Sequence, residues 1–372
     1  MRIVSVTTSF PRHGDDHAGR FVHDLHAGLC EQGHDVLTLC PEAPGVAPSE
    51  TTEAGEVRRV AYAGRGTADL FYGDGLEENV RRTRGPWRKL RRFLREAEAV
   101  VAQDRGVDVL LAHWLWPSGR ALLRAAREGR PLLGVAHGGD VHYLGRPALG
   151  SFLARGLRGA YRGVLCTSSV GSDIVRRRLA IDNVDVAPMG VDPARFHPDP
   201  GRAPPAGFPS EYVLGVGRLL PIKGFDVLIR AAAGLELPVV LAGTGPSADD
   251  WRRVAHELDV ELHLVGHLGP DAVAAAMQAA RAVVVPSRPL QNGRVEGCPV
   301  VAVEALAVGK PVLASRTGGL PDLLPDAVLF RPADSEALRD LLRRVVEGTL
   351  EMPTPRGPLT RRETALRLLA LL

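Results

Sequence analysis

The sequence predicts an α/β protein built from two doubly wound domains, each with a parallel sheet. Its 372 residues exceed what one ordinary hydrophobic core holds. Short apolar runs alternate with helical segments in both halves of the chain, and a proline-rich stretch between Pro188 and Pro209 separates the two series. The expected parts are a first domain over 1–190, a linker over 191–210, a second domain over 211–352, and a tail helix over 353–372 that packs back on the first domain.

The first half opens with an apolar strand, Arg2–Thr7, followed by a helix over Phe21–Cys30 with an apolar stripe. Further strands are expected at Val107–Ala112, Leu132–Ala136 and Gly163–Thr167. In the second half the runs YVLGVG, PVVLAG, ELHLVG, AVVVPS and PVLAS repeat this alternation. Ligands bind such sheets at the carboxyl ends of the strands, so two facing sheets would form a cleft.

The composition is that of a soluble globular protein, with 45% hydrophobic and 24% charged residues. A net charge of +3 gives no compositional case for nucleic-acid binding. The four cysteines are far apart and form no CxxC pair, which fits a reducing compartment. The N-terminus is too short and polar for a signal peptide, and no apolar run is long enough to span a membrane. We therefore expect a cytoplasmic protein.

A glycine turn follows the strand that begins at Tyr212 and carries two cations. Gly217 and Arg218 come directly after the strand, and Lys223 lies five residues beyond Arg218. Glycines let backbone amides approach a ligand closely, and two cations across a turn can grip a diphosphate. The alternative is a plain turn with two solvated cations, since the stretch lacks the full GxGxxG pattern. A second glycine turn, AGTGP, supports one edge of a nucleotide cleft.

Two acids flank an apolar stretch in NGRVEGCPVVAVEALAVGKP. Glu296 and Glu304 have seven residues between them, and Pro299 to Val308 is expected as a helix that Gly309 ends. The amides at this helix start attract phosphate. The carboxylates would lie about 10–15 Å apart, a span suited to the ribose and the hexose of a sugar nucleotide. The alternative is a surface acid at Glu296 and an arginine partner for Glu304.

Histidines follow two strands of the first half. His137 comes after PLLGVA and leads into Gly-Gly-Asp140, while His113 precedes Trp114. A histidine at a strand end can hydrogen-bond a hydroxyl or position an acceptor. His113 is alternatively an ordinary structural histidine. No pair has the H-x-x-x-H spacing of a helical metal site, so no metal is expected.

The segment Arg81–Arg95, RRTRGPWRKLRRFLR, has eight basic residues and no acid. Trp87, Leu90, Phe93 and Leu94 fall at helical spacing, which predicts a basic amphipathic helix. Such a helix could contact an anionic membrane surface or attract a phosphorylated acceptor. The alternative is a solvated face whose apolar side packs on the core.

Taken together, these stretches resemble the retaining glycosyltransferases of family 4. The matching pieces run in family order: AGRFVHDL and GHDV, DVLLAHW, HGGDV, APMGVDPARFHP, VGRLLPIKGFDVLI, AGTGP, VGHL, EGCPVVAVEALAVGKPVLAS and GGLPDLL. The resemblance implies the GT-B fold, two Rossmann-like domains facing across a cleft. It also implies a nucleoside-diphosphate sugar, UDP or GDP in kind, held by the second domain, and an acceptor held by the first. Transfer would retain the anomeric configuration and need neither metal nor cofactor.

Carried over by position, the resemblance assigns catalytic roles to His137, Arg218, Lys223 and Glu296. Arg218 and Lys223 would bind the diphosphate, Glu296 the transferred sugar and Glu304 the ribose, with His137 near the anomeric centre. The remaining donor-side residues are Gly217, Gly266, His267, Leu268, Gly297, Cys298, Pro299 and Val300. The acceptor-side residues are Gly14, Gly19, His113 and Asp140. The family's usual Gly-Gly pair is missing between Phe10 and Arg20, so Gly14 or Gly19 would replace it.

Other functions stay open at this point. A nucleotide-sugar epimerase or a phosphorylase could use the same two-domain plan. An inactive module that recognises a glycan or a lipid surface would not need both glutamates and both cations. A dinucleotide dehydrogenase fits poorly with the incomplete glycine pattern. The acceptor could be a glycan, a lipid-linked intermediate, a polyol phosphate or a small natural product.

Overall fold

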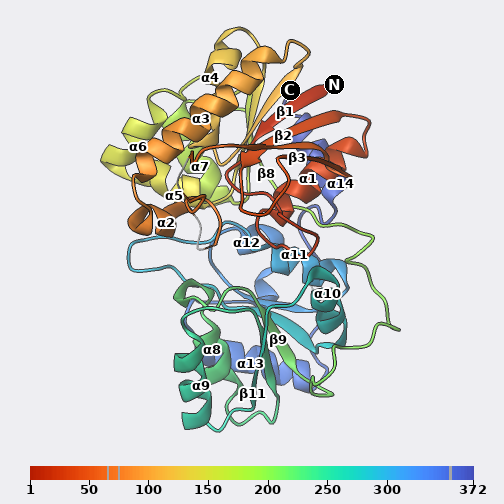
Figure 1. Cartoon of the computed structure of the whole chain (residues 1–372). Helices are drawn as coiled ribbons and strands as arrows, with labels where there is room; N and C mark the ends of the chain where they lie inside the picture. Colours follow the sequence, from red (N-terminus) through yellow and green to blue (C-terminus); the bar gives the residue numbers. More distant parts are fainter. Residues whose placement is uncertain (65–66, 74–75, 352–353) are drawn as a thin grey trace. The chain divides into compact units, whose positions relative to one another are not determined.

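The computed structural model describes residues 1–64, 67–73, 76–351 and 354–372, with the backbone alone at Glu77. The chain divides into two compact units (Figure 1). Unit 1 comprises Met1–Gly190 and Arg361–Leu372, and unit 2 comprises Val191–Thr360. Residues 191–210, the expected linker, are all described; they group with unit 2 and contain no helix or strand beyond a bridge from Val191 to Thr360.

Unit 1 is built on an eight-stranded sheet with the order β3-β4-β2-β1-β5-β6-β7-β8. Its strands are β1 (Arg2–Val6), β2 (Asp35–Pro41), β3 (Ser49–Thr52), β4 (Gly55–Val60), β5 (Val109–His113), β6 (Leu132–Ala136), β7 (Gly163–Cys166) and β8 (Val184–Val186). All neighbours are parallel except β3 and β4. Strand β1 pairs with β2 on one side and β5 on the other, so the winding reverses between β1 and β5. This reversal is the topological switch point of the sheet.

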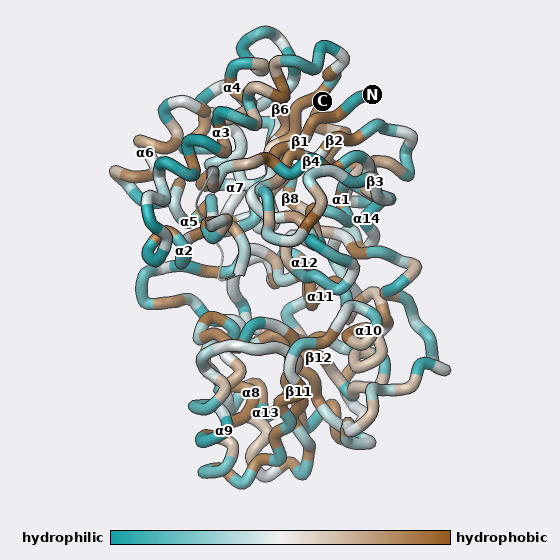
Figure 2. The backbone as a smooth tube through the Cα atoms, in the orientation of Figure 1, coloured by the Kyte–Doolittle hydropathy of each residue, from teal (hydrophilic) through white to brown (hydrophobic). Residues whose placement is uncertain are grey.

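The helices of unit 1 pack on both faces of this sheet. They are α1 (Arg20–Cys30), α2 (Leu76–Arg82), α3 (Pro86–Gln103), α4 (Ser118–Arg127), α5 (Gly139–Gly145), α6 (Pro147–Ala154), α7 (Ser169–Leu179) and α14 (Arg361–Leu369). Side chains of α3, α4 and α7 share one core cluster with the strands, and side chains of α1 belong to another. Figure 2 shows the hydrophobic colour concentrated on the strands, as expected for a sheet buried on both faces.

Unit 2 has a six-stranded, fully parallel sheet with the order β11-β10-β9-β12-β13-β14. Its strands are β9 (Val213–Val216), β10 (Val239–Ala242), β11 (Leu262–Gly266), β12 (Ala282–Val285), β13 (Val312–Ser315) and β14 (Leu329–Phe330). Its helices are α8 (Phe225–Ala232), α9 (Ala248–Glu257), α10 (Pro270–Ala279), α11 (Val300–Ala307), α12 (Leu320–Leu323) and α13 (Ser335–Val346), with short 3-10 turns η1 (Pro221–Lys223) and η2 (Asp326–Val328). The switch point lies between β9 and β12, because β9 pairs with both β10 and β12.

The tail helix α14 packs against α1 in unit 1 (Figure 1). Gly28 of α1 permits this close approach, since a Cβ atom there would lie 2.5 Å from the Arg361 carbonyl oxygen. The buried Arg361 forms ion pairs with Glu31 at 2.6 Å and Glu53 at 3.2 Å. These contacts hold the C-terminal helix in the first unit although it follows the second in sequence.

The expectation of one basic helix over Arg81–Arg95 is wrong, because the segment is divided between two helices. Helix α2 ends at Arg82, and α3 starts at Pro86 after Gly85, which has φ 62°. Proline suits a first helical turn because it lacks the amide hydrogen that would have no partner there. Leu90 and Phe93 are buried, whereas the Trp87 side chain is 55% exposed.

Among the described residues no helix is both long enough and apolar enough to cross a bilayer.

Candidate active site

The polar side chains of interest in unit 2 gather where β9 and β12 end. These two strands flank the switch point of the six-stranded sheet, so their carboxyl ends border the crevice where ligands bind in such sheets. The segment after β9 supplies Gly217, Arg218 and Lys223, and the segment after β12 supplies Ser287 and Glu296.

Gly217 shapes the path of Lys223. Its φ is 147°, a value that other residues rarely adopt, and a Cβ atom there would lie 3.1 Å from Cε of Lys223. The lysine stem therefore crosses directly over the glycine. Lys223 is the last residue of the 3-10 turn η1, and Arg218 follows Gly217 with a half-buried side chain.

Lys223 and Glu296 form an ion pair, with Nζ 2.7 Å from Oε1. The hydroxyl of Ser287 donates to the other carboxylate oxygen, Oε2, at 2.5 Å. Ser287 is buried, and its own carbonyl accepts a hydrogen bond from the Ser315 hydroxyl. Sequence reasoning missed Ser287, although a polar residue just after the run AVVV carries the same strand-end signal that pointed to His137. Both oxygens of Glu296 are thus held in place by named donors.

Helix α11 starts beside this pair. Pro299 is its N-cap, and no side chain of the described residues caps the helix start. Glu304 lies inside the helix with a half-buried side chain. Gly297 and Cys298 are buried, and the Gly297 carbonyl accepts from Gly319 at 2.6 Å. Burial raises the pKa of the Cys298 thiol to about 12, so this residue offers its backbone and not a thiolate. The helix start matches the expected one, with Pro299 one position before the first helical residue.

The other donor-side residues lie along the same row of strand ends. Gly266 ends β11, His267 is exposed and Leu268 is half-buried. The Gly243 amide donates to the Gly266 carbonyl at 2.7 Å, and the Gly217 amide donates to Ala242 at 2.9 Å. The ends of β9, β10 and β11 are thereby joined through their backbones.

In unit 1, three histidines lie in a row near the switch point. His113 is the last residue of β5, and His137 follows β6 directly. Nδ1 of His113 lies 3.0 Å from Nε2 of His137, and Nε2 of His113 lies 3.1 Å from Nε2 of His26 on α1. The row continues to Thr38 of β2, whose hydroxyl is 2.8 Å from Nδ1 of His26. Sequence reasoning did not find His26 or Thr38, because they come from a helix stripe and a strand interior.

These histidines are neutral at pH 7. Burial lowers the pKa of His26 and of His137 to about 3, and burial together with the two neighbouring rings lowers that of His113 well below its ordinary value. His113 is fully buried, so in this structure it contacts His137 and has no surface to offer an acceptor.

The His137 ring is framed by two aromatic side chains. The ring centroids of Trp114 and Phe21 each lie 4.8 Å from that of His137. Trp114 has φ 60°, a left-handed value that is uncommon for a bulky residue. Backbone of this kind concentrates at functional sites, and it marks the β5 end as a specialised loop.

Asp140 links the loops after β5 and β6. Its carboxylate accepts from the Leu115 amide at 2.8 Å and from the His137 amide at 3.1 Å, and its side chain is buried. Burial raises its pKa to about 6, against the opposing effect of the backbone amides. The sequence prediction assigns Asp140 to the acceptor side. In the structure its buried carboxylate instead holds the backbone amides of Leu115 and His137.

The first loop of unit 1 contains Gly14 and Gly19. Gly14 is exposed, while Gly19 is the N-cap of α1 with φ 70°. Between them Asp16 is buried and pairs with Arg12 at 2.6 Å. Burial alone would raise the pKa of Asp16, but hydrogen bonds from Arg12 and from backbone amides outweigh it and lower the pKa to about 2. The loop is therefore held by a buried ion pair.

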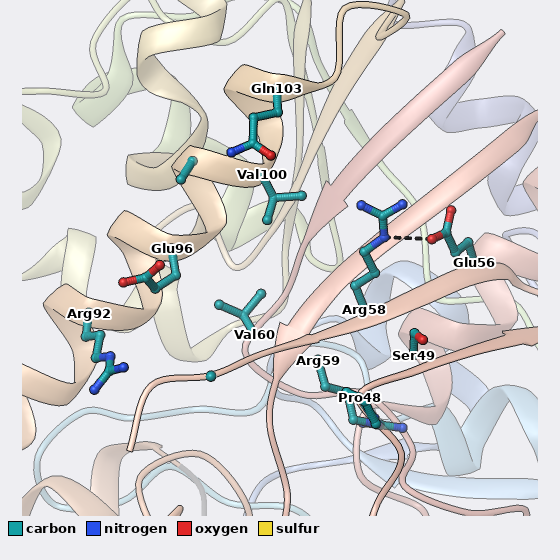
Figure 3. A pocket seen from close by; sticks show the side chains of 12 residues that line it. Pro48, Ser49, Glu56, Arg58, Arg59, Val60, Arg92, Glu96, Val100 and Gln103 are labelled. Atoms are coloured by element: carbon teal, nitrogen blue, oxygen red, sulfur yellow. Dashed lines mark hydrogen bonds and ion pairs between the residues drawn. The ribbon is translucent and has the colours of Figure 1, made fainter. Parts of the chain in front are cut away.

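A surface cavity of about 620 Å³ lies between the β3–β4 edge and helix α3 (Figure 3). Its lining includes Arg58, Arg92 and Glu96, and Arg58 is paired with Glu56 at 2.6 Å. None of the predicted site residues lines it.

Comparison with known families assigns both halves of the chain. Residues 18–195 match the model of Glycosyltransferase Family 4, and residues 206–356 match that of Glycosyl transferases group 1. A D-inositol 3-phosphate glycosyltransferase of Mycobacterium leprae is 40% identical over 159 residues, which are 39% of this chain and 35% of that protein. A GDP-mannose-dependent alpha-(1-6)-phosphatidylinositol monomannoside mannosyltransferase of Mycobacterium tuberculosis is 34% identical over 155 residues, 38% of this chain and 40% of that one. The matches thus span less than half the length of these curated relatives.

Solved structures agree on the fold along the whole chain. Sucrose-phosphate synthase from Thermosynechococcus elongatus superposes with a TM-score of 0.73 at 22% identity, covering 100% of this chain and 94% of that one. The catalytic domain of starch synthase IV from Arabidopsis thaliana, bound to ADP and acarbose, gives 0.65 at 17% identity with the same coverage. With both halves matched and the two α/β units in place, the chain belongs to the group 1 glycosyltransferases of the GT-B fold.

Proposed function

We propose that this chain is a retaining glycosyltransferase that moves a sugar from a nucleoside-diphosphate sugar to an acceptor hydroxyl without a metal ion. The observation that carries the proposal is the Lys223–Glu296 contact at the switch point of unit 2, next to the start of α11. A cation, an acid and the amides of a helix start, which no side chain caps among the described residues, match the sugar and diphosphate parts of a nucleotide sugar.

Lys223 and Glu296 can each bind a ligand while they remain paired with each other. An ammonium has three donors, and Lys223 directs one of them to Glu296, which leaves two for phosphate oxygens. Each oxygen of Glu296 has a further lone pair for a sugar hydroxyl. The start of α11 favours negative charge, and Glu304 on the same helix is the proposed acceptor for the ribose hydroxyls.

The proposed reaction replaces one bond at the anomeric carbon. The bond from this carbon to the diphosphate oxygen breaks, and a bond to the acceptor oxygen forms on the same face. The acceptor proton passes to an oxygen of the departing diphosphate. Lys223, Arg218 and the start of α11 stabilise the negative charge that grows on the leaving group, which is the part a metal ion would otherwise take.

The names of two relatives favour a phosphorylated polyol as the acceptor. One acts, by its name, with D-inositol 3-phosphate, and another with GDP-mannose and a phosphatidylinositol mannoside. We propose a UDP or GDP sugar as the donor and a hydroxylated, phosphorylated acceptor of the polyol kind. A cytoplasmic location stays a prediction. Contact of the Arg81–Arg95 segment with an anionic membrane also stays a prediction, and vesicle co-sedimentation can test that contact.

A thermal-shift screen of nucleoside diphosphates and their sugars tests the proposal first. We expect at least one diphosphate to raise the melting midpoint, and proton NMR of the transfer product to show the anomeric configuration of the donor. An epimerised sugar formed without acceptor, or cleavage that depends on inorganic phosphate, would replace the proposal with the epimerase or the phosphorylase.

A further inference from the structure

A row of four side chains runs from the interior of unit 1 to the end of β6. It starts at Thr38 in the middle of β2, passes through His26 and His113, and ends at His137. The three contacts measure 2.8, 3.1 and 3.0 Å, all within hydrogen-bond distance. Thr38, His26 and His113 are fully buried, while His137 is half-buried.

The ring geometry is that of hydrogen bonds and not of stacking. For His113 and His137 the nitrogens are 3.0 Å apart and the centroids 5.2 Å apart, with only 9° between the planes. The two rings therefore meet edge to edge and nearly coplanar, so that a lone pair of one faces a nitrogen of the other. His26 and His113 also meet through their nitrogens, at 3.1 Å, although their planes are turned by 71°.

Neutral imidazoles allow only two proton arrangements in such a row. Each ring has one N–H donor and one bare acceptor nitrogen, and every contact between two rings needs one of each. If Nδ1 of His26 carries a proton, all protons point toward Thr38 and His137 is left with a bare Nδ1. If Nδ1 of His26 is bare, all protons point the other way and His137 carries its proton on Nδ1.

Thr38 decides between the two arrangements. Among the described residues its hydroxyl makes no hydrogen bond other than the one to His26. If the hydroxyl accepted from His26, its own proton would be buried without an acceptor among the described residues, which is unfavourable. If it donates to His26, only lone pairs are left over at Thr38, and the one proton of the row without a partner among the described residues is on Nδ1 of His137, at the half-buried end of the row.

We propose that Thr38, acting through His26 and His113, holds His137 as the Nδ1–H tautomer. His137 then presents a hydrogen-bond donor, and not a base, to an oxygen of the bound sugar or acceptor. The substrate part of this statement rests on the proposed function, whereas the tautomer does not. Nδ1 of His137 has no hydrogen-bond partner among the described residues, so it is available to a ligand. The row ends in a fully buried threonine, which makes it an orienting device and not a path for proton export.

Imidazole nitrogen NMR of the 372-residue chain tests the tautomer directly. In long-range proton–nitrogen spectra of ¹⁵N-histidine protein, protonated and bare ring nitrogens resonate in separate ranges, and His26→Gln and His137→Gln assign the signals. We expect at pH 7 a proton on Nε2 of His26 and on Nδ1 of both His113 and His137. A proton on Nε2 of His137, or a doubly protonated ring in the row, would overturn the proposal.

A pair of variants isolates the threonine. Thr38→Val keeps the shape but removes the hydroxyl, and Thr38→Ser restores it. We expect Thr38→Val to lose the single Nδ1–H state of His137, and Thr38→Ser to recover it. If the His137 signals of Thr38→Val equalled those of the wild type, Thr38 would not set the tautomer.

Kinetics with a donor and acceptor found by the screen then link the tautomer to the reaction. We expect Thr38→Val to lower kcat several-fold, less than the roughly tenfold loss expected when the His137 hydrogen bond itself is removed, with KM for the donor changed less. Thr38→Ser should recover most of that loss. An unchanged kcat in a Thr38→Val protein whose tautomer has shifted would refute the role in transfer. Absence of any transfer by the wild type, with the expected spectra, would refute the proposed function and leave the tautomer standing.

Discussion

The two units place their polar groups at the same topological position but with opposite electrostatics. At the unit 2 switch point, Lys223 and Glu296 form a part-exposed ion pair beside a helix start. At the unit 1 switch point, buried neutral histidines lead to His137, and the Asp140 carboxylate accepts hydrogen bonds from the backbone amides of Leu115 and His137. One sheet end suits a charged leaving group and the other an uncharged hydroxyl. Equal topology therefore does not imply equal chemistry.

Removing the charged groups of unit 2 should have the largest effect. We expect Lys223→Ala and Glu296→Ala each to lower the transfer rate roughly 100- to 1,000-fold, the usual cost of losing a preorganised electrostatic contact. The matched control is Glu211→Ala, which removes a solvent-exposed ion pair with Arg281 of the same 2.7 Å length. Rates that fall equally in the control would show a general loss of folding.

Asp140 should make unit 1 less stable as the pH rises. Its pKa is about 6 in the folded chain against 3.8 in the unfolded chain, so the folded state binds the proton more tightly. The stabilisation is complete below pH 4 and is lost between pH 4 and 6, by about 3 kcal/mol. The measurement is the unfolding free energy of the wild type minus that of Asp140→Asn at pH 4 and at pH 7. The exposed Asp173→Asn is the control, and a difference that does not vary with pH would contradict the assignment.

Asp16 should show the opposite dependence. Its folded pKa of about 2 lies below the ordinary 3.8, so its ion pair with Arg12 stabilises the fold above pH 4. We expect up to about 2 kcal/mol at pH 7, lost as the pH falls from 4 to 2. Urea titrations of Asp16→Asn and of the neighbouring exposed Asp15→Asn, at pH 3 and pH 7, measure it. Equal midpoints for the two variants at pH 7 would count against the buried pair.

The neutral histidine should have a smaller effect that does not vary with pH. We expect His137→Ala to lower kcat about tenfold, the worth of one hydrogen bond. Because the pKa of His137 is about 3, its titration should leave no step in the wild-type rate between pH 5 and pH 8. The exposed His256→Ala on α9 is the control. A pH step that disappears in His137→Ala would show that His137 titrates as a base.

Local signals in the sequence predicted the two-sheet plan and the strand-end positions. Leu132–Ala136 is a strand with the expected bounds, and Pro299 lies at the start of the predicted helix. Alternating apolar runs, prolines and glycines report such features because they act over a few residues.

Contacts between distant segments were not predictable in this way. The row from Thr38 to His137 joins two strands and a helix, and Ser287 meets Glu296 only because the segment between β12 and α11 folds back on itself. The break between α2 and α3 was missed because the basic and apolar spacing continues across Gly85. Such features depend on the packed fold, and one sequence does not record which side chains meet.

Isothermal titration of the nucleoside diphosphate identified by the screen tests most directly whether unit 2 carries the anion site. We predict that Lys223→Ala raises Kd at least tenfold, since a hydrogen bond to a charged group contributes about 1.5–3 kcal/mol. His137→Ala should leave Kd within about twofold, because a neutral donor in unit 1 adds little to diphosphate binding. Wild-type affinity in Lys223→Ala, or an equal loss in both variants, would contradict the account.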